Sequence, residues 1–321
     1  MSVYKRTMKD KILPFLLLPL PLVLIFGFPL HAQRAIDVSY VQDAQGSYVF
    51  SCTNHAFCNY VLTVEFTTLE NAKSDHLLPY QAQVKPGVTK LFKLSKQQAG
   101  GDVRFKYSVD FFKGCINPSV DTGITYLLPI SPGKEAQAYE LRNLPRPQSG
   151  EPPTKTFYTI RLKMHPGDTL FAARRGTVVA VDVSSDVNDL GGTSSGDEDY
   201  VEIVHRDCSF GHYGTLKKDG AFVKPGQVVE AGQPIGIIGG DRYGRGSEAR
   251  IGVYYNESPD DAPAGNGKVA EIGRIYVPLK FWTKKNGSGM LRHGASYTSE
   301  FPAALLTQET GKPRSSGKRR K

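Results

Sequence analysis

The sequence has 321 residues, of which 40% are hydrophobic and 22% are charged. These values are ordinary for a globular protein, and the length is sufficient for two domains that each have a core. The formal net charge of +9 comes mainly from the two ends of the chain, so it is not evidence for a nucleic-acid-binding domain.

Residues 1–32 have the layout of a secretory signal peptide. Four basic residues in the first eleven precede an apolar run at 12–30, and Ala32 offers a small residue at a plausible cleavage point. The alternative is a retained membrane anchor, because such a run is about long enough to span a bilayer. Prolines within the run favour cleavage, and no cysteine follows it that would carry a lipid. We therefore expect export to the periplasm or the cell exterior.

Without residues 1–32, which carry four basic residues and one acidic residue, the net charge falls from +9 to +6. The segment 312–321 carries six basic residues and no acidic one, so the body of the chain is nearly neutral. We expect residues 301–321 to form a basic, disordered tail that is solvated or attracted to an anionic envelope surface. No nucleic-acid partner is expected, because an exported protein rarely meets one.

The pattern of residues 33–130 predicts a small N-terminal β-sandwich. Hydrophobic and polar residues alternate along 103–111 and along 60–66, which is typical of half-buried antiparallel strands. The side chains predicted to face the core are those of Val103, Phe105, Tyr107, Val109, Phe111, Leu62, Val64 and Phe66. Nothing in this region indicates catalysis, and we interpret it as a binding or spacer domain.

Four cysteines follow the signal peptide. In an oxidising compartment Cys52 and Cys58 could bridge each other, or one of them could pair with Cys115, which would leave Cys208 unpaired. A zinc knuckle is the other possibility because His55 lies between Cys52 and Cys58. The CxxxxxC spacing is unusual for a metal site, however.

Residues 131–155 are rich in proline and predict an extended connector, with one short ordered piece at 135–141. A second β domain is expected at 156–300. Within it, the acidic loop around 184–199 departs from the spacing of a calcium loop, because Leu190 occupies the fifth position counted from Asp186. We expect a solvated hairpin loop there.

Residues 211–240 contain glycines and a proline every few residues, between short runs of valine and isoleucine. Pro225 and Gly226 suit a type II turn, because proline fixes φ and glycine accepts a positive φ. This spacing of glycine and proline is typical of short strands that fold into a barrel-like sandwich. Biotinyl and lipoyl carriers have a similar spacing. A carrier needs a modified lysine, which an exported protein is not expected to receive.

The segments 167–181, 200–240 and 249–255 together resemble the M23 family of zinc endopeptidases, the lysostaphin-like enzymes that cut peptidoglycan crosslinks. His205 falls at the end of the family's I-x-H strand, and 213–216 falls at its Y-x-H-L segment. The resemblance implies an all-β chain in which the β-sandwich precedes an antiparallel, barrel-sandwich-hybrid-like domain. The arrangement also looks like exported M23-type proteins of some Gram-negative bacteria.

Enzymes of this family hold zinc with an H-x-x-x-D motif and the second histidine of H-x-H, leaving a position open for water. Counting along the matched segments places the first motif on Phe157 and Arg161 and the second on Arg250 and Gly252. The histidine of Y-x-H-L falls on Thr215. Phenylalanine and glycine side chains cannot coordinate zinc, and an arginine repels a dication. The resemblance therefore implies a degenerate member without catalytic residues, metal ligands or a cofactor.

If the fold is kept, the side chains of Arg161, Tyr213, Thr215, Arg250 and Tyr254 would line the former groove. Arginine binds carboxylates in bidentate geometry, and tyrosine stacks on ligand faces. Peptidoglycan stems carry carboxylates, so the expected partner is peptidoglycan or an envelope protein. The alternative is that these side chains only fill an abandoned cleft.

Two other functions stay open. One is an active cell-wall zinc endopeptidase whose ligands are displaced, drawn from His165, Asp168, His205, Asp207 and His212. The other is a regulator of a different cell-wall hydrolase, as inactive relatives of this family can be.

Overall fold

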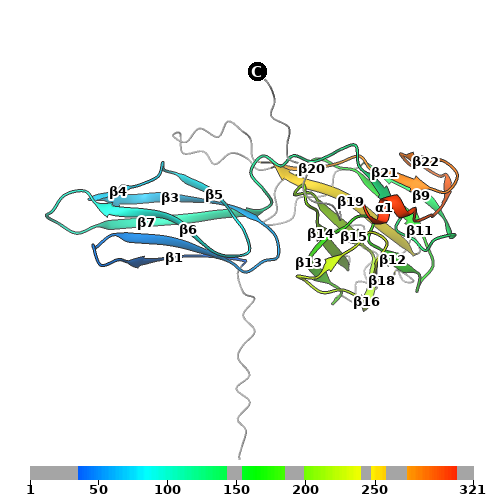
Figure 1. Ribbon diagram of the computed structural model, residues 1–321, viewed down its shortest axis with the longest axis horizontal. Helices are drawn as coiled ribbons and strands as arrows, with labels where there is room; N and C mark the ends of the chain where they lie inside the picture. Colours follow the sequence, from blue (N-terminus) through cyan, green and yellow to red (C-terminus); the bar gives the residue numbers. More distant parts are fainter. Residues whose placement is uncertain (1–34, 143–153, 185–198, 240–246, 258–272, 309–321) are drawn as a thin grey trace, which may run out of the picture. The chain divides into compact units, whose positions relative to one another are not determined.

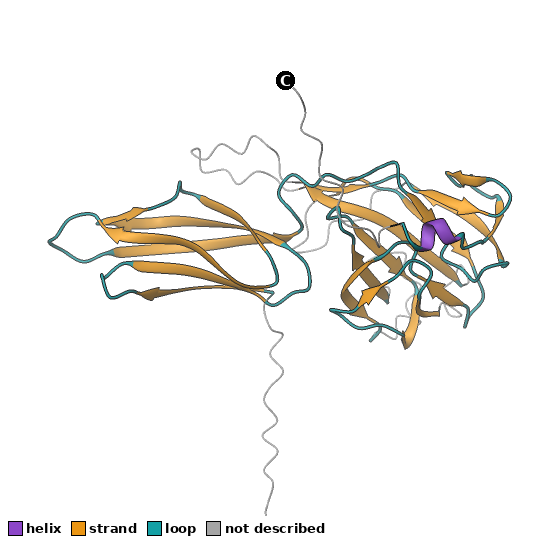
Figure 2. Cartoon of the chain, in the orientation of Figure 1, coloured by secondary structure: helices purple, strands orange, loops and turns teal. Residues whose placement is uncertain are grey.

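The computed structural model describes residues 35–142, 154–184, 199–239, 247–257 and 273–308, all within one compact unit. The expected signal peptide, most of the acidic loop and the basic tail from 309 onward lie outside these residues. The described part is almost entirely β, with one short helix, α1 (Ala303–Leu306) (Figures 1 and 2). This confirms the all-β prediction. No helix in the described ranges has the length and hydropathy to cross a membrane.

The N-terminal region forms the predicted sandwich from two antiparallel sheets. The first sheet has the order β1 (Ile36–Gln42), β2 (Tyr48–Asn54), β6 (Gly87–Lys96) and β4 (Ala72–Ser74). The second has the order β5 (Tyr80–Val84), β3 (Tyr60–Glu70) and β7 (Arg104–Lys113). Residues from both sheets share one hydrophobic core, in which the rings of Phe50 and Phe92 stack with centroids 4.6 Å apart.

The alternation predicted for this core is confirmed over most of its length. Leu62 and Val64 are fully buried, and the other predicted residues of β3 and β7 as far as Val109 pack against the core. Phe111 differs, because it is 42% exposed at the end of β7. Its neighbour Phe112 points to the opposite face and is buried with its cross-strand partner Val61. The outer face of the sandwich is therefore covered at this end.

A large sheet dominates the rest of the chain (Figure 1). Its order is β17 (Val228–Val229), β13 (Gly176–Asp182), β14 (Tyr200–Val204), β15 (Phe210–Gly214), β19 (Glu248–Glu257), β11 (Thr159–Lys163), β9 (Glu135–Leu141) and β23 (Ser296–Thr298), and β20 (Gly273–Tyr276) joins β19 to β10 (Thr154–Thr156). Two three-stranded sheets accompany it. One has the order β12 (Thr169–Phe171), β18 (Pro234–Ile238), β16 (Leu216–Ala221), and the other β22 (Gly287–Gly289), β21 (Lys280–Thr283), β8 (Thr125–Leu127).

The predicted connector contains more structure than an extended linker. The short ordered piece expected at 135–141 is strand β9, which pairs with β11 and β23 inside the large sheet. Residues 143–153 lie outside the described ranges. The first part of the connector therefore contributes to the second domain instead of only leading to it.

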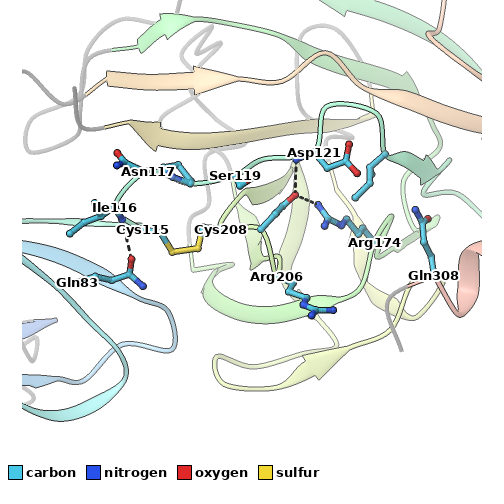
Figure 3. A pocket seen from close by; sticks show the side chains of 13 residues that line it. Gln83, Cys115, Ile116, Asn117, Ser119, Asp121, Arg174, Arg206, Cys208 and Gln308 are labelled. Carbon is cyan, nitrogen blue, oxygen red and sulfur yellow. Dashed lines mark hydrogen bonds and ion pairs between the residues drawn. A yellow bond between two sulfur atoms is a disulfide. The ribbon is translucent and has the colours of Figure 1, made fainter. Parts of the chain in front are cut away.

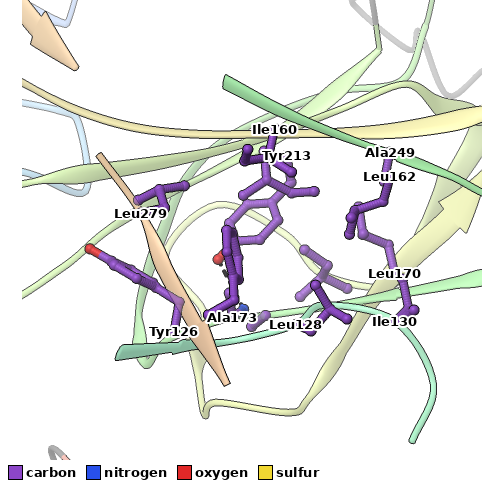
Figure 4. Close-up of a cluster of buried hydrophobic side chains, with 14 of the residues drawn as sticks. Tyr126, Leu128, Ile130, Ile160, Leu162, Leu170, Ala173, Tyr213, Ala249 and Leu279 are labelled. Carbon is purple, nitrogen blue, oxygen red and sulfur yellow. Dashed lines mark hydrogen bonds between the residues drawn. The ribbon is translucent and has the colours of Figure 1, made fainter. Parts of the chain in front are cut away.

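One face of the large sheet is buried in a hydrophobic core. Alternate residues of β11, β14, β15 and β19 point into it, as Figure 4 shows for Ile160, Tyr213 and Ala249. The Tyr213 hydroxyl accepts a hydrogen bond from the Ala173 amide at 3.0 Å, which satisfies both polar groups in an apolar setting. The turns behave as predicted, because Gly226 has a φ of +87°.

The cysteine pairing differs from the prediction. Cys115 and Cys208 form a disulfide across 93 positions of sequence, while Cys52 and Cys58 are buried thiols. Cys52 lies on β2 inside the sandwich core, and Cys58 lies in a separate cluster with Phe210 and Tyr254. Burial raises the pKa of Cys52 to about 11 and that of Cys58 to about 12. These two thiols are therefore protonated and unreactive at neutral pH.

We expect peptide mapping of the oxidised protein without reductant to show one linkage, between Cys115 and Cys208. Alkylating reagents should modify Cys52 and Cys58 only after denaturation, because both side chains are buried. Replacing Cys115 and Cys208 with serine should lower the free energy of unfolding by about 2–4 kcal/mol, since the crosslink closes a long loop. A linkage between Cys52 and Cys58 would contradict this assignment.

Candidate functional site

The candidate site lies on the face of the large sheet that points away from the core, here called the polar face. Cross-strand pairing places Tyr139, Arg161, Arg250 and Gly214 in one row across β9, β11, β19 and β15. Because side chains in a strand alternate between faces, residues two positions along each strand join the same surface. Gly252, His212 and Glu202 form the next row.

Two arginines on this face share one carboxylate. Arg161 donates from Nη1 to Oε2 of Glu248 at 3.0 Å, and Arg250 donates from Nε to Oε1 at 2.7 Å. The side chains of Arg161, Glu248 and Arg250 are 16%, 8% and 13% exposed. Arg161 is also held by Tyr139, whose ring centroid lies 5.2 Å from the guanidinium carbon. We call these residues the Arg–Glu–Arg cluster (Arg161, Glu248 and Arg250).

A cavity of about 330 Å³ opens beside this cluster. It is lined by Tyr139, Arg161, Lys163, Ser247 and Glu248. Sequence reasoning predicted Arg161 here but missed the others, because Tyr139 lies in the expected connector and Ser247 and Glu248 precede the matched strand. Only the register of β9, β11 and β19 brings them together.

The positions assigned to zinc ligands do not fit a metal ion. At Gly252, an added Cβ would lie 2.9 Å from Cε1 of Tyr276 and 3.0 Å from Oγ1 of Thr159. The ring of Phe157 packs against the same Tyr276, with centroids 4.9 Å apart. A histidine at Gly252 would force the ring of Tyr276 to move, and the neighbouring Arg161 adds a positive charge that repels a dication. We therefore derive no chemistry through zinc.

The histidines and aspartates considered as displaced ligands do not converge. His165 is a surface side chain, 91% exposed, whose Nδ1 lies 3.7 Å from Asp168. His205 is buried, and its Nδ1 lies 2.8 Å from the carbonyl oxygen of Arg175. Burial, together with the charge of Arg174, lowers the pKa of His205 to about 4.

The other two displaced candidates are held by different neighbours. Asp207 accepts a hydrogen bond from Nη1 of Arg174 at 2.9 Å. His212 stacks on the ring of Tyr200, with centroids 4.9 Å apart. In the ranges that the structure describes, no three histidine, cysteine or acidic side chains gather in a way that could hold a metal ion.

Three of the five predicted groove residues do not line a groove. Tyr213 and Thr215 are fully buried, and Tyr254 is 1% exposed. Tyr213 pairs with Ile251, the neighbour of Arg250 on β19. Its side chain therefore points to the opposite face from Arg250, into the core. The structure therefore brings together only Arg161 and Arg250 of the predicted set.

An ion pair between a partly exposed lysine and a buried glutamate occupies another part of the polar face. Nζ of Lys113, at the end of β7, donates to Glu202 at 2.6 Å, and the Tyr254 hydroxyl donates to the same carboxylate. Lys113 also lies 5.5 Å from the ring centroid of Phe210, and its carbonyl accepts a hydrogen bond from Asn256 at 2.8 Å. Sequence patterns gave no signal for this contact, because its partners are 89 positions apart.

Charge pairing overcomes the cost of burial in this network. Burial alone would raise the pKa of Glu202, but the charge of Lys113 and the hydrogen bonds from Lys113 and Tyr254 hold it below its usual value. Burial likewise acts to lower the pKa of Lys113, yet Glu202 raises it well above its usual value. Both groups are therefore charged at neutral pH.

A second cavity, of about 1040 Å³, lies beside the disulfide (Figure 3). Its wall contains Cys115 and Cys208, and the Arg174–Asp207 ion pair lies along it. The Asp121 amide donates to the same Asp207 carboxylate at 3.4 Å. The charged side chains here already neutralise each other, so this cavity shows less preference for a charged ligand than the first.

Comparisons with known proteins agree with the resemblance seen in the sequence. Residues 156–262 match the model of peptidase family M23, and a search of curated proteins found no match. Among solved structures, the catalytic domain of lysostaphin from Staphylococcus simulans is 23% identical, covering 37% of this chain and 78% of that one, with a TM-score of 0.26.

Two longer solved structures also resemble this chain. Csd3 of Helicobacter pylori is 12% identical, covering 68% of this chain and 72% of that one, with a TM-score of 0.28. A zinc-containing peptidase from Vibrio cholerae is 13% identical, covering 68% and 75%, with a TM-score of 0.24.

We expect Lys113→Met to lower the free energy of unfolding by about 3–5 kcal/mol, because it leaves the Glu202 carboxylate buried without its counter-charge. The double variant Lys113→Met, Glu202→Gln should recover much of this loss. Urea denaturation of both variants and the parent protein measures the difference. Equal losses in the single and double variants would contradict a coupled pair.

The same pair predicts a pH dependence. The lowered pKa of Glu202 contributes stability above the pKa of the unfolded chain, about 4.3, and that stability is lost as the pH falls through the folded value. Acidification below about pH 4 should therefore destabilise the parent protein more than the double variant, as measured by urea denaturation at each pH.

Proposed function

We propose that this chain, whose residues 156–262 form a domain of peptidase family M23, is an exported pseudoenzyme that binds peptidoglycan without cleaving it. The proposal rests on the residues that occupy the positions of the family's metal site. Arg161 and Arg250 share Glu248 there, and Tyr276 fills the space beside Gly252. The arginine, glycine and tyrosine residues at these positions do not supply the ligands that zinc needs to activate a water molecule.

The loss of catalysis follows from what a zinc hydrolase needs. Three ligands must converge on the metal and leave a fourth position open for water. The polar face instead presents three cations, Arg161, Arg250 and Lys163, around the single carboxylate of Glu248. An excess of positive charge repels a dication and attracts an anion.

The family supports peptidoglycan as the ligand. M23 peptidases act on its peptide crosslinks, and the stem peptides carry carboxylates that arginine side chains bind well. A binding domain can keep the scaffold that recognises such peptides after the zinc chemistry is lost. An envelope protein with exposed carboxylates is the alternative partner, and a pull-down from envelope extracts would reveal it.

Two features support export. The layout of residues 1–32 is that of a signal peptide, and the Cys115–Cys208 disulfide suits an oxidising compartment. We propose the periplasm or the cell exterior as the location. The basic segment at 312–321 would add attraction to an anionic envelope surface.

We expect the mature protein, residues 33–321, to retain less than stoichiometric zinc after exposure to the metal and gel filtration. It should also release no soluble fragments from purified peptidoglycan. Elemental mass spectrometry and a dye-release assay measure the two quantities, with the lysostaphin catalytic domain as the positive control. One zinc per chain together with fragment release would overturn the proposal.

Binding to purified sacculi tests the second half of the proposal. Arg161→Ala with Arg250→Ala should weaken co-sedimentation by about tenfold or more, because truncating buried charged contacts costs more than the 1.4 kcal/mol that a factor of ten requires. Arg175→Ala is the matched control, since Arg175 pairs with Glu230 on the surface. Circular dichroism should show that both variants are folded. Equal binding by all three proteins would contradict a role for the Arg–Glu–Arg cluster.

A further inference from the structure

Two residues that line the 330 Å³ cavity each carry a buried polar atom without a hydrogen-bond partner. These atoms are Nε of Arg161 and Oγ of Ser247, which find none among the residues that the structure describes. Ser247 is only 8% exposed, so its hydroxyl is not simply hydrated from the surface. Buried polar groups in native proteins are almost always paired, and two such atoms at one cavity indicate a missing acceptor.

The acceptor must come from outside the cluster. Both oxygens of Glu248 are already engaged, one by Nη1 of Arg161 and the other by Nε of Arg250. Glu248 therefore fixes the guanidinium of Arg161 without satisfying its Nε–H. The ring of Tyr139, 5.2 Å from the guanidinium carbon, limits its movement further. The donor is held in place before any ligand arrives, which lowers the entropic cost of binding.

The charge of the cavity favours an anion. Arg161, Arg250 and Lys163 outnumber Glu248, so the cluster keeps an excess of positive charge after the ion pairs are formed. A carboxylate offers two acceptor oxygens, one for each of the two donors. The nearby Glu248 carboxylate would repel a dianion more strongly than a monoanion, which disfavours phosphate.

We infer that this cavity binds the free carboxylate of a short peptide. Nε of Arg161 and Oγ of Ser247 donate to its oxygens, and Lys163 at the exposed end of the cavity adds attraction. The volume of 330 Å³ lies at the lower end of the roughly 300–1,000 Å³ usual for small-molecule sites, so the bound portion is about the size of a dipeptide. The inference deepens the proposed function and names the group that the polar face recognises.

Such a carboxylate has two sources, the D-amino-acid end of a cell-wall stem peptide and the L-amino-acid end of a protein. The experiment is isothermal titration of the mature protein with N-acetyl-D-alanyl-D-alanine and N-acetyl-L-alanyl-L-alanine, each as the free acid and as the C-terminal amide. We expect the free acid of at least one stereoisomer to bind at least tenfold more tightly than its amide. A preference for the D form indicates the cell wall, and a preference for the L form indicates a protein terminus.

Three variants locate the binding. Ser247→Ala removes one hydroxyl and should weaken binding of the acid about fivefold, while Arg161→Lys keeps the charge beside Glu248 but removes Nε–H and should weaken it at least tenfold. Lys217→Ala, an exposed change on β16, is the matched control and should have no effect. Thermal unfolding checks that each variant is folded.

The outcomes separate this inference from the proposed function. Equal affinities for acid and amide, or acid binding that Ser247→Ala and Arg161→Lys leave unchanged, would overturn the carboxylate site. Binding to sacculi in that case would leave the proposed function standing. Tight binding of the free acid without binding to sacculi would instead support the carboxylate site, and it would exclude peptidoglycan as the source of the bound carboxylate.

Discussion

The burial of one face of the large sheet is the constraint on which the rest of this structure depends. The side chains of Ile160, Tyr213 and Ile251 are at most 1% exposed and share one core. Their burial fixes the register of β11, β15 and β19. A shift by one residue would exchange the core and polar faces. The same register that hides these side chains places Arg161 opposite Arg250. The geometry of the site is therefore a consequence of the packing of the core.

Two contacts link the end of the sandwich to the region that contains the large sheet. The disulfide joins Cys115 to Cys208, and Lys113 forms an ion pair with the buried Glu202. Lys113 ends β7 and Cys115 follows it closely, while Glu202 lies on β14 and Cys208 lies between β14 and β15. A covalent link lowers the entropy cost of forming the nearby ion pair. The Arg–Glu–Arg cluster and its cavity lie on another part of the polar face.

Sequence patterns predicted most of the fold but only part of the site. Alternation along β3 and β7 and the turn at Pro225-Gly226 are local signals, and the structure confirms them. Spacing within the matched segments also predicted Arg161 and Arg250. The pairing of Cys115 with Cys208 and the contact between Lys113 and Glu202 join positions about ninety residues apart, and no local pattern encodes such pairs. Motif spacing does not reveal that Tyr213 points into the core, nor that Tyr254, on the polar face, is covered by its contact with Glu202.

The loss of the metal site that we propose would involve several residues, so a single substitution would not restore it. A zinc site needs open space at its centre as well as ligands. Here the absence of a side chain at Gly252 allows Tyr276 to approach within 2.9 Å of where a Cβ would lie, and Tyr276 in turn packs against Phe157 and Tyr254. Restoring a histidine at 252 would displace Tyr276 and still leave Arg161 beside the metal. Under the proposed function, the filled space and the excess of positive charge both disfavour a dication, and the positive charge favours an anion.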